Sequence, residues 1–396
     1  MLTKGNVWGI LIAVISTRNK RVLKLALRSK REVWQVSELS ERKKQILAAV
    51  VEQYIKTGEP VGSKGLISST GMSVSSATIR NEMSDLAAMG YLEQPHTSAG
   101  RIPSQKGYRY YVDNLMKNRE IDEINKRIIE AGISSAVGDP ERLIARASEV
   151  LADLTKCACV SSTPGGDAVI IRKIELVPVG IHSAMLVLLT SNGILKSRLC
   201  RLDCELTVTI CEQFYNIVKS CIIGKPASDI SVVSMQTVAA SVDGDVFAML
   251  PLMAAVCELA RSVSDSRLVL GGSSNLFSHK DYGTGAIELL EFLNKREPLS
   301  EVISGISEPL IVKIGRENLY RQLENSSVIV AKYSVGGDDS GTIGLIGPTR
   351  MDYENIIPSV KYLTNLVGRL ITQAIEEYKG NRNEERRDKA RKHRRS

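Results

Sequence analysis

Cysteine, aromatic residues and long apolar runs are all scarce in this 396-residue chain, and each scarcity excludes a class of protein. The seven cysteines are an odd number without the spacing of a disulfide framework, which predicts reduced thiols and a cytoplasmic location. Aromatic residues make up only 5% of the chain, which argues against a carbohydrate-binding specialist. No run reaches eighteen apolar residues, so we predict neither a membrane-spanning segment nor a membrane partner.

The motifs of catalysis and metal binding are also missing from the sequence. The four histidines are scattered and none lies near a cysteine pair, whereas a zinc site needs four ligands at recognisable spacing. The stretch "IGPTRMDY" has glycines near a predicted helix start, but it lacks the lysine and the spacing of a P-loop. There is no nucleophile elbow and no kinase signature. We therefore predict no enzymatic activity, no cofactor and no metal.

The positive charge is confined to the two ends of the chain. Residues 1–36 carry a net charge of +7 and residues 379–396 carry +6, while the whole chain carries +8, so the middle carries −5. Residues 37–118 carry only +2. A basic isoelectric point is therefore poor evidence for nucleic-acid binding in this protein. Basic residues at both ends could instead add nonspecific attraction to phosphate or simply keep disordered ends in solution.

The segment after residue 37 predicts three helices followed by a hairpin. Apolar residues recur at helical spacing over residues 41–57, with Ser40 as a possible N-cap and Gly58 as the stop. A shorter helix follows Ser63, and a third begins after Ser75. The stretch "GYLEQPHTSAGRIPS" then predicts a strand, a tight loop and a second strand. This order is typical of a winged helix-turn-helix domain.

The predicted third helix has an apolar side and a small, polar side. At about 100° per residue, the core-facing positions are all apolar: Ile79, Met83 and Leu86. Asn81 and Ser84 fall opposite them, with Arg80 on one flank and Thr78 on the other. Asn can form two hydrogen bonds with adenine and Arg with guanine, and small neighbours allow a helix to enter the major groove.

The loop between the two predicted strands is a candidate wing that contacts the DNA backbone or the minor groove. Together with the third helix and Lys64, it completes the candidate DNA-binding residues. They are Lys64, Ser75, Ser76, Thr78, Arg80, Asn81, Ser84, His96, Thr97, Ser98 and Arg101. A simpler interpretation stays open, in which Ser75 only caps a helix and the loop is only a solvated turn.

The rest of the chain has an α+β pattern in two parts. Short β-type runs begin near residue 158 and resume near residue 309, and a block with helical periodicity lies between them. This arrangement predicts one α+β domain that is interrupted by an insertion. A long helix with a single apolar face, beginning near residue 356, closes the domain.

Long stretches of the chain resemble the family of the heat-inducible transcription repressor HrcA. These are "GEPVGSKGL", "SSATIRNEMSDLAAMGYLEQPHTSAGRIPSQKGYRYYVD", "GRENLYRQLENSSVIVAKYS" and "GTIGLIGPTRMDY". The resemblance covers roughly residues 38–378, in order. The candidate residues above fall in the segment with which the family reads DNA, but which of them contact bases is our inference from the helical face.

The resemblance implies a bacterial, cytoplasmic repressor of chaperone operons that acts without a cofactor. It implies a homodimer bound to an inverted-repeat operator in double-stranded DNA, released on heat stress, with the chaperonin GroEL as modulator. The alternative is a winged-helix regulator that uses its GAF-like domain to sense a small molecule. The expected domains are an N-terminal extension (1–36), a winged helix-turn-helix domain (37–118), a GAF-like α+β domain in two parts (119–225 and 307–378), an inserted helical dimerisation domain (226–306) and a disordered basic tail (379–396).

Overall fold

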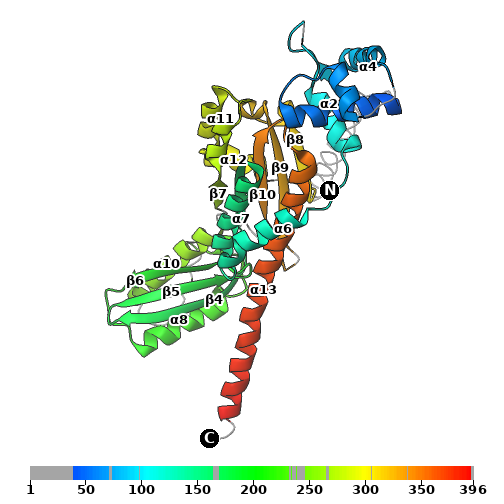
Figure 1. Cartoon of the computed structure of the whole chain (residues 1–396). Helices are drawn as coiled ribbons and strands as arrows, with labels where there is room; N and C mark the ends of the chain where they lie inside the picture. The colour runs from blue at the N-terminus through cyan, green and yellow to red at the C-terminus, as the bar shows by residue number, and fades with distance from the viewer. Residues whose placement is uncertain are drawn as a thin grey trace, which may run out of the picture. The chain divides into compact units, whose positions relative to one another are not determined.

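The computed structural model describes residues 39–70, 74–97, 99–163, 169–231, 233, 238, 246–264, 267–304, 306–336 and 338–393. They form two compact units (Figure 1). Unit 1 contains the described residues up to Glu52 together with Pro60–Pro103, and unit 2 contains Gln53–Glu59 and the chain from Ser104 onwards. The expected extension at residues 1–36 lies outside the described residues.

Unit 1 has the predicted order of three helices and a hairpin. Helix α2 spans Glu41–Thr57, α3 spans Ser63–Thr70 and α4 spans Ser76–Ala88. The strands β1 (Leu92–Glu93) and β2 (Ile102–Pro103) pair antiparallel. Apolar side chains from all of these helices and from β1 are almost fully buried: Ile46, Leu47, Val50, Val51, Leu66, Ile79, Met83, Leu86 and Leu92. The winged helix-turn-helix prediction is therefore confirmed.

The expected boundary of the head at residue 118 differs from the compact units. Helix α5 (Gln105–Tyr110) and the π-helical turn Tyr111–Leu115 that follows it belong to unit 2. The side chain of Gln105 donates to the Glu324 carbonyl at 3.1 Å and accepts from the Arg316 N–H at 3.0 Å. These contacts join residues more than 200 positions apart, so a local pattern could not reveal them.

The larger sheet of unit 2 is antiparallel, with five strands in the order β7-β3-β10-β9-β8. The strands are β3 (Ala158–Ser162), β7 (Leu268–Gly271), β8 (Leu310–Ile314), β9 (Ser326–Val335) and β10 (Asp338–Pro348). On one face, α7 (Pro140–Thr155) packs against β3 and β7, and α13 (Tyr353–His393) packs against β9. On the other, α11 (Gly285–Leu293) and α12 (Arg296–Ile303) cover a buried apolar core. This sheet confirms the predicted α+β architecture.

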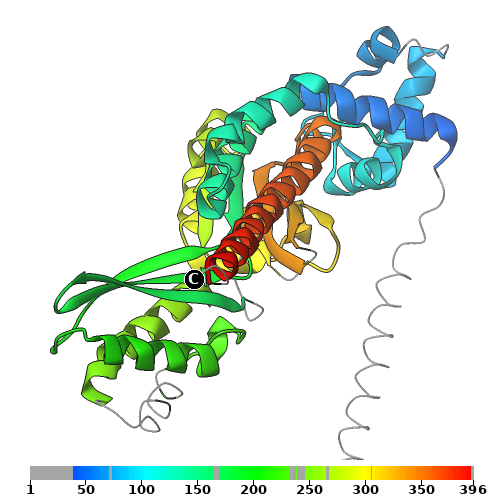
Figure 2. The same ribbon diagram turned by 90° about the horizontal axis from the view of Figure 1, so that it is seen from below.

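A second, three-stranded sheet lies between β3 and β7 in the sequence. Its strands β4 (Ile171–Gly180), β5 (Ser183–Thr190) and β6 (Leu195–Arg201) pair antiparallel in chain order. Figure 2 shows α8 (Val208–Cys221) and α10 (Val246–Ser264) on the same side of this sheet. Together they enclose a separate apolar core.

The inserted unit therefore differs from the expected helical block at residues 226–306. The separate core runs from Val169 to Val263 and includes the three strands. Strand β7 and helices α11 and α12 belong instead to the larger sheet and its core. The prediction assigned residues 226–306 to the insertion because of their helical periodicity. The end of the inserted unit is set instead by the pairing of β7 with β3, which no local pattern shows.

Short elements complete unit 2. Helix α6 spans Glu123–Ile133 and packs on α7. Among the described residues, five 3₁₀ turns connect the larger elements: Ser134–Ala136, Ala227–Asp229, Ser273–Ser278, Gly315–Glu317 and Arg321–Leu323. The expected disordered tail differs from the structure, because the backbone of α13 stays helical to His393. Its Glu, Arg, Lys and Ala residues are all favourable helix formers.

Candidate nucleic-acid interface

Helix α4 has the two sides that its sequence predicts. Its N-cap is Ser75, whose hydroxyl accepts a hydrogen bond from the Thr78 N–H at 3.1 Å. The apolar side is buried in the core of unit 1. Arg80, Asn81 and Ser84 are exposed on the remaining surface. A capped helix start next to exposed amide and guanidinium groups is the geometry that base reading in a major groove requires.

Three candidate residues at the start of α4 take part in local contacts. The hydroxyls of Ser75 and Thr78 lie 2.9 Å apart, and those of Ser76 and Ser63 lie 3.0 Å apart. The second contact ties α4 to the start of α3, which fixes the angle of the turn between the two helices. Lys64 is exposed one residue further along α3. These hydroxyls thus position the helix, and Lys64 is open to solvent.

The loop between β1 and β2 is organised by a residue that the sequence analysis did not select. The side-chain amide of Gln94 donates to the carbonyls of Thr97 and Ala99, at 2.9 and 3.1 Å. His96 and Thr97 are exposed, and Ser98 lies outside the described residues. A polar amide just before a tight loop was the only available signal, because side-chain-to-backbone bonds of this kind stabilise turns.

Arg101 lies at the base of the wing and not at its tip. Its backbone exchanges two hydrogen bonds of 2.9 Å with Val61, which adds a bridge beside the two strands. The Nε atom of Arg101 is buried and has no hydrogen-bond partner in the described part of the chain. Since Arg101 is partly buried, its placement differs from the exposed loop position that the sequence suggested.

Replacing Gly100 with Ala should loosen the wing. A Cβ atom at Gly100 would lie 2.4 Å from the Val61 carbonyl oxygen, so the bridge between Val61 and Arg101 would have to shift. We expect Gly100→Ala to destabilise unit 1 by about 1–3 kcal/mol and to weaken DNA binding. Differential scanning calorimetry and fluorescence anisotropy on the full chain measure both effects.

Gly62→Ala is the matched control for this change, because a Cβ atom there meets nothing within 4 Å. If Gly100→Ala melts and binds DNA like Gly62→Ala, the close contact at Val61 does not constrain the wing.

The cysteines are not joined in disulfide bonds. All seven are free. Burial raises the pKa of both Cys157 and Cys159 to about 12, so these thiols stay protonated near neutral pH. Within the residues that the structure describes, no three potential ligands gather to hold a metal ion. The described helices likewise include none that is both long and apolar enough to cross a membrane.

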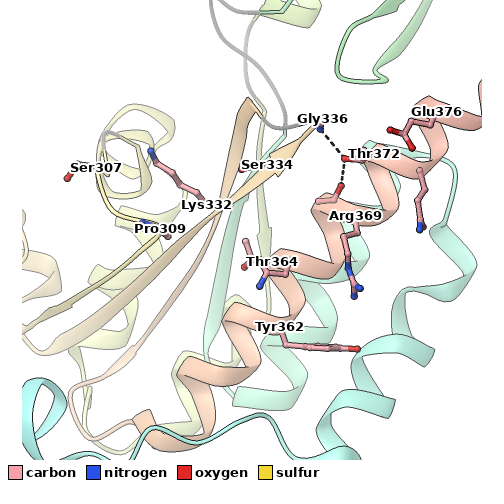
Figure 3. A pocket seen from close by; sticks show the side chains of 13 residues that line it. Ser307, Pro309, Lys332, Ser334, Gly336, Tyr362, Thr364, Arg369, Thr372 and Glu376 are labelled. Atoms are coloured by element: carbon pink, nitrogen blue, oxygen red, sulfur yellow. Dashed lines mark hydrogen bonds between the residues drawn. The ribbon is translucent and has the colours of Figure 1, made fainter. Parts of the chain in front are cut away.

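A polar groove of about 1000 Å³ runs between α13 and the end of β9 (Figure 3). Its charged lining includes Lys332 and Arg369 but also Glu376. The Gly336 N–H donates to the hydroxyl of Thr372 at 3.1 Å, so these two groups satisfy each other. On the opposite face of the sheet, the space below α11 and α12 is filled by apolar side chains. The small-molecule regulator that the sequence left open therefore stays a prediction.

Three helices, a short wing and an exposed polar surface on the third helix define a DNA-binding protein of the winged helix-turn-helix class. Residues 38–115 match the family model described as "Winged helix-turn-helix transcription repressor, HrcA DNA-binding". Residues 141–357 match the "HrcA protein C terminal domain". The chain belongs to the family of the heat-inducible transcription repressor HrcA, as its motifs suggested. Its biochemical role is accordingly that of a transcription repressor that binds DNA.

Individual relatives agree with the family assignment. A heat-inducible transcription repressor HrcA of Clostridium botulinum (strain Eklund 17B / Type B) is 34% identical over 337 residues, which are 83% of this chain and 98% of the relative. One from Acetivibrio thermocellus is 32% identical over 330 residues, or 82% and 94%. A solved structure titled "Crystal structure of a hypothetical protein at 2.2 A resolution" has a TM-score of 0.62 and 25% identity, and covers 85% of this chain and 100% of that one.

Proposed function

We propose that two copies of this chain bind an inverted-repeat operator at chaperone operons, repress transcription, and leave the DNA on heat stress. The observation that carries the proposal is the exposed set of Arg80, Asn81 and Ser84 on the capped helix α4. Arg and Asn are the side chains best suited to distinguish guanine and adenine in the major groove. A two-fold pair of such helices would read two half-sites of opposite orientation.

The outward face of the β4-β5-β6 sheet supports the homodimer. Val177, Met185 and Leu199 are paired across the three strands, and their side chains are 47%, 38% and 55% exposed. Two positions further along the same face of β5, beyond Val187, Leu189 pairs with Leu195, which is 56% exposed. The other face of this sheet is already buried against α8 and α10. An antiparallel sheet with one face in the core usually presents polar residues on the other, so the exposed apolar row of Val177, Met185 and Leu199 is consistent with a partner surface.

The modest charge of the head is a second reason to expect a dimer. Residues 37–118 carry a net charge of only +2. Nonspecific attraction to phosphate grows with the number of cations that contact the backbone. A single head is therefore expected to bind weakly, and linking two heads raises the effective concentration of the second at its half-site.

Release of the protein from DNA on heating follows from the same dependence of affinity on dimer formation. Two apolar sheet faces that separate or unfold at high temperature would leave single heads with low affinity. Chaperonins bind exposed apolar surface, so GroEL is the expected modulator that returns such chains to the paired form. The cytoplasm, where both the operator and the chaperonin are found, is the expected location.

Binding to a chaperone-promoter inverted repeat tests this function directly. The purified protein is titrated against the repeat and against scrambled DNA of equal length, at 50 and 200 mM salt. We expect preferential binding to the repeat that persists at the higher salt, since base contacts depend less on counterion release than phosphate contacts do. Equal and steeply salt-dependent binding to both duplexes would contradict the proposal, because it would reflect the basic ends alone.

A further inference from the structure

Lys43 of α2 holds two carboxylates of the reading helix. Its ammonium group lies 2.6 Å from Oε2 of Glu82 and 2.9 Å from Oδ2 of Asp85, both on α4. The Lys43 side chain is only 16% exposed, and so is that of Glu82. Arg42 adds a longer contact of 3.7 Å to Glu82 from a more exposed position. One partly buried lysine thus contributes most of the ionic contact between the two helices.

The two carboxylates lie beside the surface that reads DNA. At about 100° per residue, Glu82 and Asp85 lie on the flank of α4 opposite Arg80, between the core side and the exposed side. Asp85 is 59% exposed, so part of its charge reaches solvent. Helix α4 (Ser76–Ala88) contains one cationic side chain, Arg80, and two acidic ones, Glu82 and Asp85. Without Lys43, α4 would present a net negative charge to the approaching DNA phosphates.

We propose that Lys43 is a positioning residue for DNA binding, which docks α4 on α2 and neutralises the two carboxylates next to the reading surface. The hydrogen bond to Glu82 is the main cause of the raised pKa of Lys43, so the lysine stays charged over the whole physiological range. Each carboxylate that loses its counter-charge would repel the phosphates of the bound strand. Such repulsion is long-ranged at low salt and is screened within about 10 Å at 0.1 M salt.

The electrostatic part of this role predicts a distinctive salt dependence. We expect Lys43→Met in the full chain to weaken binding about tenfold at 50 mM salt, and by much less at 300 mM, where the carboxylates are screened. The loss should affect operator and scrambled DNA alike, since phosphates are common to both. Lys44→Met is the matched control: Lys44 occupies the next position on α2 and contacts Glu41 of the same helix. It should change affinity little.

A rescue variant separates neutralisation from folding. Adding Glu82→Gln and Asp85→Asn to Lys43→Met removes the exposed negative charges, and we expect it to restore wild-type affinity even if the melting temperature stays low. A binding defect that is independent of salt and persists in the triple variant would overturn the proposal and leave Lys43 a purely structural contact. The inference rests on the proposed function only for the operator sequence. If the wild type does not prefer the operator, the proposed function is wrong. The effect of Lys43→Met on DNA binding can still be measured on both duplexes.

Discussion

Replacing Met185 with Glu is expected to split the proposed dimer and to lower operator affinity by about 100-fold or more. Met185 is the central residue of an exposed apolar row and pairs with Val177 on one side and Leu199 on the other. A carboxylate placed there in both copies would meet a like charge and an apolar surface, and burying it would be costly. The buried face of the sheet is untouched, so the monomer should still fold.

Sedimentation velocity and anisotropy on the same samples measure this effect. Ile124→Glu provides the control, because Ile124 is an exposed apolar residue, at 72%, on the separate helix α6. It should leave both the mass and the affinity unchanged. A Met185→Glu protein that sediments as a dimer with wild-type affinity would show that the β4-β5-β6 face is not the interface.

Substitutions on the exposed side of α4 are expected to have the next largest effect. Arg80→Ala and Asn81→Ala should each cost about 1–3 kcal/mol of operator binding, which is about tenfold for every 1.4 kcal/mol. Binding to scrambled DNA should change less, so the preference for the operator falls. Both side chains are exposed, and neither substitution should alter the melting temperature by more than a surface change usually does.

Lys64→Ala distinguishes base reading from backbone contact. Lys64 is exposed on α3, and as a phosphate ligand it should weaken binding equally on both duplexes and lower the salt slope by about one unit. If Arg80→Ala and Asn81→Ala behave in the same uniform way, these side chains contact phosphates and the choice of reading face is wrong.

Local sequence patterns predicted the winged helix-turn-helix well because its determinants are local. The cap at Ser75, the apolar spacing within α4 and the end of α2 before Gly58 each involve residues a few positions apart. Gly58 has φ +70°, the left-handed backbone that favours glycine at a helix end. The order of helices and strands could therefore be predicted before any contact was known.

Long-range contacts account for what the sequence could not show. The bridge between Val61 and Arg101 spans 40 positions, and the contact from Lys43 to Glu82 spans 39. Neither follows from helical period or turn composition. The extent of the inserted unit was missed for the same reason, since it depends on which strands pair. Local chemistry thus indicates what each helix presents, and only the fold shows which charges and strands meet.

The inserted unit leaves the larger sheet and returns to it at a single point. The Thr163 N–H donates to the Arg267 carbonyl, and the Arg267 N–H donates to the Thr163 hydroxyl, both at 2.8 Å. Ser162 and Leu268 are the next pair in the antiparallel ladder. Topologically, residues 164–266 are the loop of a very large β-hairpin. Evolution could therefore lengthen, exchange or remove this module without changing the register of the parent sheet, because the cost of closing a loop grows only slowly with its length. The proposed dimer surface could therefore change at this one hairpin while the DNA-binding head stays the same.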